Sequence, residues 1–360
     1  MRVLACAIIV AALGACGGAA PPIAVQDYFD LASEANAPAL TVLRAGGLSG
    51  IAFDAKGQLL AVSDARDSPR ILMLDVHENP FRLEPTGMIH LWGCPEKLDP
   101  EGIAILPNGN LLIASEGVQN EEPRTAPGIF EFTRDGEWLR TLDLRNRFIP
   151  PLEGPITVGV RDNRSFESLT LARDGTRFFT AVESALAQDG EPANFDHGTR
   201  ARILEYVHKG ETFVPAREWV YETDPVARPD FPTGMVVNGV AELVALDDGD
   251  LLVLERSYAG EADGGPRGLQ RIRIYQASMQ GATDVSTMDS LAGRRVRPVT
   301  KRLVLDLGQA PSLPPILSSL DNFEGMAFDA PGSDGRRRLW LVSDDNFSKT
   351  QRTWFTRLQY

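Results

Sequence analysis

Carboxylate side chains recur at matching places in five segments of this chain. Each segment has a polar or acidic residue, a short apolar run, a turn rich in Gly or Asp, a second apolar run and a closing acid. The clearest copy runs from Glu101 through Asn108-Gly109 to Glu116. Asn-Gly between two apolar runs strongly indicates a β-hairpin, because both turn residues must tolerate positive φ. The first and last residues of each hairpin must then meet at its open end. The five pairs are Ser49 with Asp64, Glu101 with Glu116, Glu167 with Glu183, Glu242 with Glu255, and Glu324 with Asp344.

Carboxylates gathered in this way predict a metal site. If the hairpins surround a channel, about nine carboxylates converge on one mouth, where they repel each other unless a cation or an arginine neutralises them. Calcium takes six to eight oxygen ligands in a tolerant geometry, and the four histidines lack the spacing of zinc ligands. We therefore predict Ca²⁺ as the cofactor. Hydrogen bonds from backbone N–H groups, or ion pairs with arginines of the next repeat, are the alternative for each single acid. The predicted metal ligands are Glu242, Glu324, Asp344, Glu101 and Asp64.

Arginines stand beside the same acids. Arg164 precedes Glu167, Arg256 follows Glu255, and Arg66 comes just after Asp64. Because a guanidinium binds phosphate or carboxylate through two hydrogen bonds, these arginines either hold an anionic substrate or neutralise the acids. We favour neutralisation for Arg66 and a catalytic role for Arg164 and Arg256.

Two further residues, Asn346 and His197, are weaker candidates. Asn346 and Arg66 are candidate substrate contacts at the same mouth. His197 lies in a polar loop, where it is either a general base or a solvated loop residue.

The repeats predict an all-β fold, a β-propeller with five or six blades of antiparallel strands. Short-strand repeats of a few tens of residues indicate a solenoid or a propeller, and radial stacking places the blades around a channel. Outer strands are expected at residues 71–74 and 88–91, with further pairs after each later repeat. A strand at residues 41–43 is expected to close the ring against the last strand, residues 354–358, which removes exposed sheet edges. A short helix is expected at residues 25–35.

The N-terminus predicts export. Arg2 precedes an apolar run, and Leu13-Gly14-Ala15-Cys16 resembles the lipobox of bacterial lipoproteins, in which Cys16 is lipidated. We expect a signal peptide over residues 1–15, a tether and short N-terminal segment over 16–38, and the propeller over 39–360. The expected location is the periplasmic side of the cell envelope, anchored to the outer membrane through Cys16. Secretion after cleavage near Ala20 is the alternative. The net charge of −13 argues against nucleic acid as a partner, and we expect a monomer.

Several segments resemble the phytase-like family, also called esterase-like activity of phytase. The segments are residues 163–170 (Asn-Arg-Ser-Phe-Glu-Ser-Leu-Thr), 252–256 (Leu-Val-Leu-Glu-Arg), 322–326 (Asn-Phe-Glu-Gly-Met) and 342–347 (Val-Ser-Asp-Asp-Asn-Phe). Ser165 and Ser168 depart from the family pattern, which commonly has glycine at the first of them. The resemblance implies a secreted propeller-like domain that hydrolyses phosphate or carboxyl esters. By analogy with calcium-dependent propeller phytases and lactonases, calcium would activate a water molecule and Glu167 or Glu255 would act as general base.

These observations lead to three hypotheses about function. The first is a calcium-dependent hydrolase of small anionic phosphate esters. The second is a lactonase or carboxylesterase that uses the same metal. The third is a propeller without catalytic activity, which binds a ligand or scaffolds an envelope complex.

Overall fold

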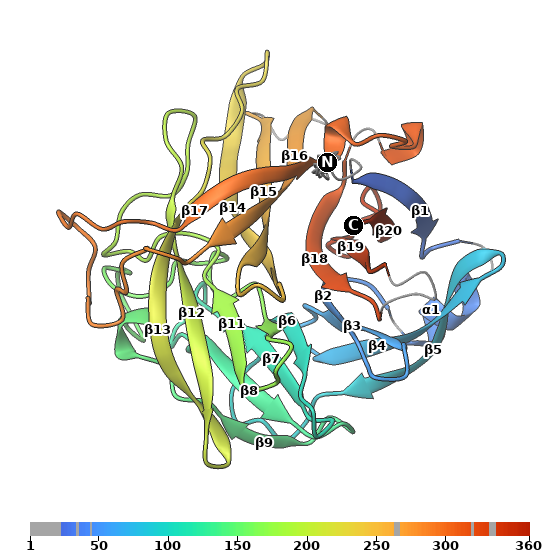
Figure 1. Cartoon of the computed structure of the whole chain (residues 1–360), viewed down its shortest axis with the longest axis horizontal. Helices are drawn as coiled ribbons and strands as arrows, with labels where there is room; N and C mark the ends of the chain where they lie inside the picture. The colour runs from blue at the N-terminus through green and yellow to red at the C-terminus, as the bar shows by residue number, and fades with distance from the viewer. Residues whose placement is uncertain (1–22, 34–35, 44, 263–266, 318–319, 331–335) are drawn as a thin grey trace, which may run out of the picture.

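The computed structural model describes residues 23–33, 36–43, 45–262, 267–317, 320–330 and 336–360. Within these residues the strands form five antiparallel sheets of four strands each, arranged as the blades of a ring (Figure 1). The predicted all-β propeller is confirmed, and the described part of the chain contains five blades. No helix in the described residues is long and apolar enough to cross a membrane.

The blades follow one another along the chain. The first contains β2 (Leu48–Phe53), β3 (Leu59–Ser63), β4 (Arg70–Glu78) and β5 (Phe81–His90). The second contains β6 (Pro100–Ile105), β7 (Leu111–Ser115), β8 (Gly128–Phe132) and β9 (Trp138–Thr141). The third contains β10 (Thr170–Leu171), β11 (Arg177–Ala181), β12 (Arg200–Lys209) and β13 (Thr212–Glu222). The fourth contains β14 (Thr233–Ala245), β15 (Leu251–Glu261), β16 (Gly268–Ser278) and β17 (Thr300–Asp306).

The fifth blade joins the two ends of the chain. Its strands are β18 (Asn322–Phe328), β19 (Arg338–Asp344), β20 (Trp354–Gln359) and β1 (Ala24–Asp30). In Figure 1 the blue β1 lies beside the red β20, and the register pairs Phe29 with Phe355. Closure of the ring by N- and C-terminal strands is therefore confirmed.

The identity of the closing strand differs from the prediction. The expected helix at residues 25–35 is wrong, because residues 24–30 form β1, which supplies the fourth strand that β20 would otherwise lack. The expected strand at residues 41–43 is also wrong, because these residues end the short helix α1 (Ala37–Leu43). The strand propensity of Thr41 and Val42 did not decide their conformation, because β propensity depends strongly on packing against a neighbouring strand. The propeller sheet thus begins inside residues 16–38, the range expected to hold a tether and a short N-terminal segment.

The innermost hairpins form as the sequence predicts. At the second blade, the N–H of Leu106 bonds to the carbonyl of Asn110 at 2.8 Å, and Gly109 has φ 89°. The five first strands, β2, β6, β10, β14 and β18, each contact the next around the channel. Apolar side chains fill the space between blades, as where Leu60 and Val62 of β3 pack with Ile103 of β6. The core is therefore a ring of layers between blades, and it fixes how the hairpin ends face one another.

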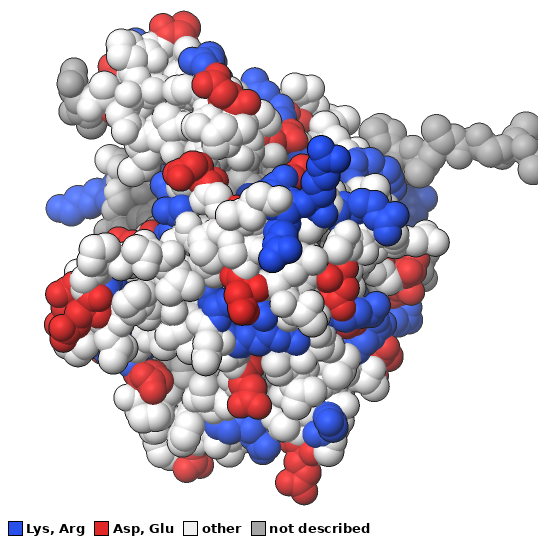
Figure 2. Space-filling view, turned by 90° about the vertical axis from the view of Figure 1, so that its left-hand side faces the viewer, with Lys and Arg blue, Asp and Glu red and all other residues white. Residues whose placement is uncertain are grey.

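Within the described residues, three short 3₁₀ helices lie in the connections between strands. These helices are η1 (Asn146–Phe148), η2 (Leu307–Gln309) and η3 (Pro315–Leu317). On the face that Figure 2 shows, acidic and basic side chains are interspersed. Many other acids are buried at one end of the channel.

Candidate functional site

Backbone bulges turn acidic side chains of the first strands toward the channel mouth. The register of the second blade shifts between Pro100 and Gly102, and that of the fifth shifts between Phe323 and Gly325. The skipped residues are Glu101 and Glu324. An extra residue in one strand re-aims its side chain, which is a known use of β-bulges near active sites. Both acids are buried.

Close packing of the first strands brings these acids near one another. A Cβ on Gly50 would lie 2.4 Å from the carbonyl oxygen of Glu101. A Cβ on Gly102 would lie 2.9 Å from the carbonyl oxygen of Glu167. Glycine at these two positions lets neighbouring blades approach closely enough for their acids to share one space.

The second strands supply another acid each, except in the fourth blade. Asp64, Glu116 and Glu183 directly follow strands β3, β7 and β11 or their extensions, and Asp344 ends β19. The register places Asp344 opposite Asn322 and places Arg256 opposite Gly239. Glu255 therefore lies at the strand position that Ser63, Ser115 and Ser343 occupy in other blades. Arg256 lies at the next position, where those blades have Asp64, Glu116 and Asp344. In the fourth blade, the guanidinium of Arg256 thus stands where the other blades have a carboxylate.

We call the resulting group of buried carboxylates the acidic mouth. Its members influence one another electrostatically. They are Asp64, Asp99, Glu101, Glu116, Glu167, Glu183, Glu324 and Asp344. The predicted convergence of acids from several blades at one mouth is thus observed.

Burial and mutual repulsion raise the pKa values in the acidic mouth. Burial first, and then the charges of Glu324 and Asp99, raise the pKa of Asp64 to about 7. Burial raises the pKa of Glu116 to about 8, although the N–H of Ser165 donates a hydrogen bond to its Oε1 at 2.5 Å. Burial, Glu324 and Asp64 raise the pKa of Asp344 to about 9. Carboxylates whose ionised forms are this unfavourable need either protons or a cation.

One side of the acidic mouth is neutralised internally, and we call it the arginine side. Arg256 lies 3.1 Å from Glu183 and 3.4 Å from Glu324, so it links the blades on either side of its own. Its Nη1 also donates to Oδ1 of Asn322 at 2.8 Å. The Arg256 side chain is only 14% exposed. This geometry makes Arg256 an internal counter-ion whose polar contacts are within the protein.

The opposite side of the acidic mouth carries excess negative charge, and we call it the open side. Asp99, Glu101 and Glu116 are buried there, and one carboxylate oxygen of each lies within 4.8 Å of the others. Arg66 reaches only Asp99, at 2.5 Å, and is partly exposed. Oδ1 of the neighbouring Asp64 is buried and accepts no hydrogen bond from the described residues.

The donors on the open side fit a divalent cation of the calcium type. The three clustered groups, Asp99, Glu101 and Glu116, all offer carboxylate oxygens from the second blade. Beside them, Oδ1 of Asp64 from the first blade has no partner among the described residues. Hard cations bind such oxygen donors, and calcium tolerates their irregular placement. Asp99, Glu101, Glu116 and Asp64 are therefore the residues that would hold it.

Glu255 and Glu242 lie outside the acidic mouth, although the hairpin argument placed them there. Glu255 accepts hydrogen bonds from Tyr221 at 2.7 Å, from the amide of Asn238 and from Lys301. At its position on β15, the Glu255 side chain points away from the acidic mouth, toward Tyr221 and Lys301. This arrangement does not support the predicted role of Glu255 as a general base.

Glu242 lies in the channel wall and has backbone partners. It occupies the position held by Gly102 and Gly325 in other blades, one residue beyond the bulge. Its Oε1 accepts the N–H groups of Leu243 at 2.9 Å and Leu169 at 3.1 Å. Burial raises its pKa, and these N–H groups partly offset the increase. The contacts of Glu242 therefore match the structural alternative of backbone hydrogen bonding rather than a ligand of a shared cation.

The remaining predicted residues divide between the mouth and other places. Arg164 is half-buried, its charge acts on Glu183, and its side chain has no hydrogen bond or ion pair with another described residue. Asn346 is exposed beside the acidic mouth, and its N–H donates to Oδ1 of Asp344 at 2.8 Å. Cys16 lies outside the described residues.

His197 lies in a different region. It bonds to Asn194 at 2.8 Å and lines a separate cavity of about 400 Å³ together with Asp189 and Thr199. The structure does not place it with the acidic mouth.

Asp99 is the main site residue that the sequence did not single out. Its backbone carbonyl accepts the N–H of Glu116, and its own N–H donates to Oγ of Ser115, so it is fixed beside the pair Glu101 and Glu116. The only sequence signal is an acid two residues before the acid of the repeat. Glu116 and Glu183 were expected at the mouth without an assigned role.

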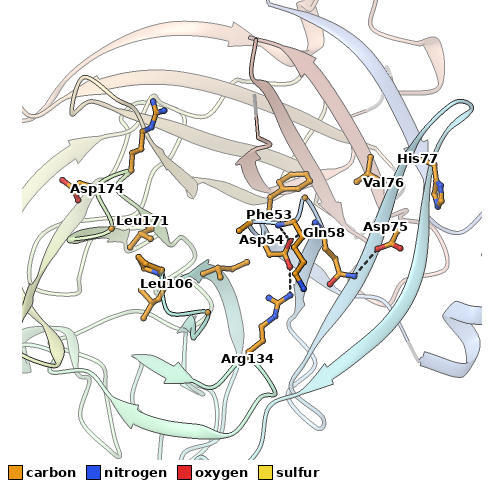
Figure 3. Close-up of a pocket in the computed structure, with 18 residues that line it drawn as sticks. Phe53, Asp54, Gln58, Asp75, Val76, His77, Leu106, Arg134, Leu171 and Asp174 are labelled. Atoms are coloured by element: carbon orange, nitrogen blue, oxygen red, sulfur yellow. Dashed lines mark hydrogen bonds and ion pairs between the residues drawn. The ribbon is translucent and has the colours of Figure 1, made fainter. Parts of the chain in front are cut away.

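A cavity of about 1090 Å³ lies at the turn ends of the innermost hairpins (Figure 3), at the other end of the channel from the acidic mouth. Asp54 and Arg134 form an ion pair of 2.9 Å across it, between the first two blades. Gln58 bonds to Asp75 at 3.1 Å on the same side. The cavity mixes acidic and basic side chains, and it contains no member of the acidic mouth.

Comparison with known proteins gives one match to a family and several to single proteins. An uncharacterized secreted protein of the fungus Arthroderma benhamiae is 28% identical over 190 residues, which cover 46% of this chain and 35% of that protein. The match thus spans about a third of the relative's length. The periplasmic gluconolactonase of Pseudomonas aeruginosa is 13% identical with a TM-score of 0.32, covering 87% of this chain and 85% of that one. A mannose phosphorylase from Leishmania mexicana is 13% identical with a TM-score of 0.38, covering 88% and 83%.

The family match covers most of the propeller. The family described as "Phytase-like: Esterase-like activity of phytase" matches residues 43–347, which include the acidic mouth and the segments whose motifs resemble it. The chain therefore belongs to the phytase-like family, esterase-like activity of phytase.

Proposed function

We propose that this protein is a calcium-dependent hydrolase of small phosphate esters. The observation that carries the proposal is the open side of the acidic mouth, where three buried carboxylates lie within 4.8 Å and the adjacent Oδ1 of Asp64 has no partner among the described residues. Membership of a family whose description includes esterase-like activity and phytase supports an ester as the substrate.

A bound divalent cation would neutralise the open side and polarise an oxygen of the substrate. Glu167 is the best placed general base. It is buried, and burial together with the charges of Glu116 and Glu101 raises the pKa of its carboxyl group. When the open side is neutralised, Glu167 can ionise and accept the proton of an attacking water.

Arg164 is the group that would hold the substrate anion. It lies beside the acids without a hydrogen bond or ion pair to other described residues, so its guanidinium is available to a phosphoryl oxygen. Arg256, in contrast, is occupied by Glu183, Glu324 and Asn322. We therefore assign substrate binding to Arg164 and charge compensation to Arg256.

The test measures binding and turnover separately. The purified chain is stripped with chelator, and its melting temperature and hydrolysis of p-nitrophenyl phosphate and p-nitrophenyl acetate are measured with and without calcium. Calcium-dependent release of phosphate supports the proposal. Cleavage of the acetate alone would favour the carboxylesterase hypothesis, and calcium-induced stabilisation without any cleavage would favour a binding protein.

We also propose that the protein acts outside the cytoplasm, anchored by lipid at Cys16. The lipobox-like segment supports this location, as does the description of the fungal relative as secreted. Metabolic labelling with palmitate should mark the full precursor but not Cys16→Ser. Labelling of both proteins, or of neither, would contradict an anchor at Cys16.

A further inference from the structure

An aromatic ring stands exposed at the rim of the acidic mouth. Phe347 is 54% exposed, although it is a large apolar side chain. The point where Gly47 would carry a Cβ lies 2.5 Å from the Phe347 ring and 2.0 Å from Oδ1 of Asp64. The ring and the unpartnered carboxylate oxygen therefore approach the same glycine and lie next to each other.

The acidic mouth itself holds the turn that presents this ring. The N–H of Asn346 donates to Asp344, a member of the acidic mouth, and the N–H of Phe347 donates to Oδ1 of Asp345 at 3.0 Å. The same Oδ1 accepts the N–H of Gly47 at 2.9 Å. The position of the ring is thus tied to the carboxylates and to the start of the first blade.

The backbone of this turn is strained. Asn346 has φ 48° and Phe347 has φ 51°, and neither is glycine. Left-handed conformations of such residues cost free energy, and they cluster at functional sites where surrounding contacts impose them. The ring lies against Gly46 and Gly47, and yet just over half of the side chain stays exposed to solvent.

We propose that Phe347 binds the organic part of the substrate, and that the substrate is an ester whose alcohol carries an aryl group. The proposal rests on the hydrolase function proposed above and specifies its substrate class. Aromatic rings pair favourably with other aromatic groups in offset or edge-on arrangements. A polyphosphate without apolar surface would gain nothing from the ring, and the excess of acids around the mouth would repel its additional charges.

Binding of two non-hydrolysable phosphonates tests the proposal without requiring turnover. Phenylphosphonate and methylphosphonate share the anionic group and differ in the ring. In the calcium-loaded full chain, calorimetry should give a dissociation constant roughly three- to tenfold lower for phenylphosphonate. Phe347→Ala should reduce this ratio to about one, whereas Phe347→Tyr, which keeps a ring, should preserve it.

Leu139 provides a matched control, because it is an apolar residue 38% exposed on β9, the outermost strand of the second blade. Leu139→Ala should preserve the preference for the phenyl compound. Equal binding of the two phosphonates by the wild type, an unchanged ratio in Phe347→Ala, or no binding of either compound would overturn the proposal. A Phe347-dependent preference in a chain that cleaves no ester would support this binding surface and refute only the hydrolase function.

Discussion

The two sides of the acidic mouth solve the same electrostatic problem in different ways. On the arginine side, Arg256 replaces the acid of the fourth repeat and bridges Glu183 and Glu324. On the open side, the ion pair between Asp99 and the partly exposed Arg66 is the only one that Asp99, Glu101 and Glu116 form with described residues. The arginine at the position of an acid in one blade thus divides the mouth into a half with an internal counter-ion and a half for which we propose an external cation.

Removal of the Arg256 guanidinium should have the largest effect on stability. Arg256→Ala leaves Glu183 and Glu324 buried without their counter-ion, and loss of one partner of a buried pair costs about 3–5 kcal/mol. The free energy of unfolding, measured by urea denaturation in chelator, should fall by that amount. Arg256→Lys, which keeps the charge but not the fork, should lose less. A loss below about 1 kcal/mol for the alanine variant would refute internal compensation.

Calcium should act on the open side alone. A ligand that binds only the folded state at 100 times its dissociation constant stabilises by about 2.7 kcal/mol. Melting of the chelated wild type should therefore shift upward when calcium is added. Glu101→Gln should abolish the shift because Glu101 is one of the three close carboxylates.

The control for the calcium response is on the arginine side. Glu183→Gln should keep the calcium-induced shift, since Arg256 already compensates Glu183. If the two glutamine variants lost the shift equally, the division of the mouth into two sides would be wrong.

Substitution of Arg164 should affect substrate binding, whereas substitution of Arg256 should affect stability. Arg164→Ala should raise KM for p-nitrophenyl phosphate by about tenfold or more, because a hydrogen bond to a charged group contributes about 1.5–3 kcal/mol. Its melting temperature should stay close to that of the wild type, since no ion pair with a described residue is removed. A fall in stability comparable to that of Arg256→Ala would show that Arg164 is also a structural counter-ion.

The smallest effect is expected at the far end of the channel. Arg134 pairs with Asp54 in a partly solvated position. Such pairs contribute about 0–1 kcal/mol. Arg134→Ala should therefore change the unfolding free energy by no more than that and leave calcium binding unaltered. A lost calcium response in this variant would mean that the two ends of the channel are coupled.

Much of this architecture can be predicted from the sequence because hairpin signals are local. Asn108-Gly109 and the apolar runs beside it are sufficient to predict β6 and β7, and the acids at the open ends follow from the geometry of a hairpin. The closing strand was misplaced because residues 24–30 become a strand only by pairing with β20, more than 300 residues away in the chain. No local pattern contains that partner.

The roles of the acids depended on register. Glu255 and Arg256 are adjacent in sequence, and successive residues of a strand face opposite sides of a sheet. The pairing of Gly239 with Arg256 turns the arginine, rather than Glu255, toward the mouth. The bulge before Glu242 likewise places that acid against backbone N–H groups.

By itself, the sequence determined a closed ring of hairpins with acids at their open ends, because turn residues and alternating apolar runs act over short distances. Only the tertiary structure decided which acids share a space, which of them pair with Arg256, and that Asp99 and Phe347 lie beside them. Those outcomes depend on bulges, on register and on how closely neighbouring blades approach. They are set by contacts between residues far apart in the chain.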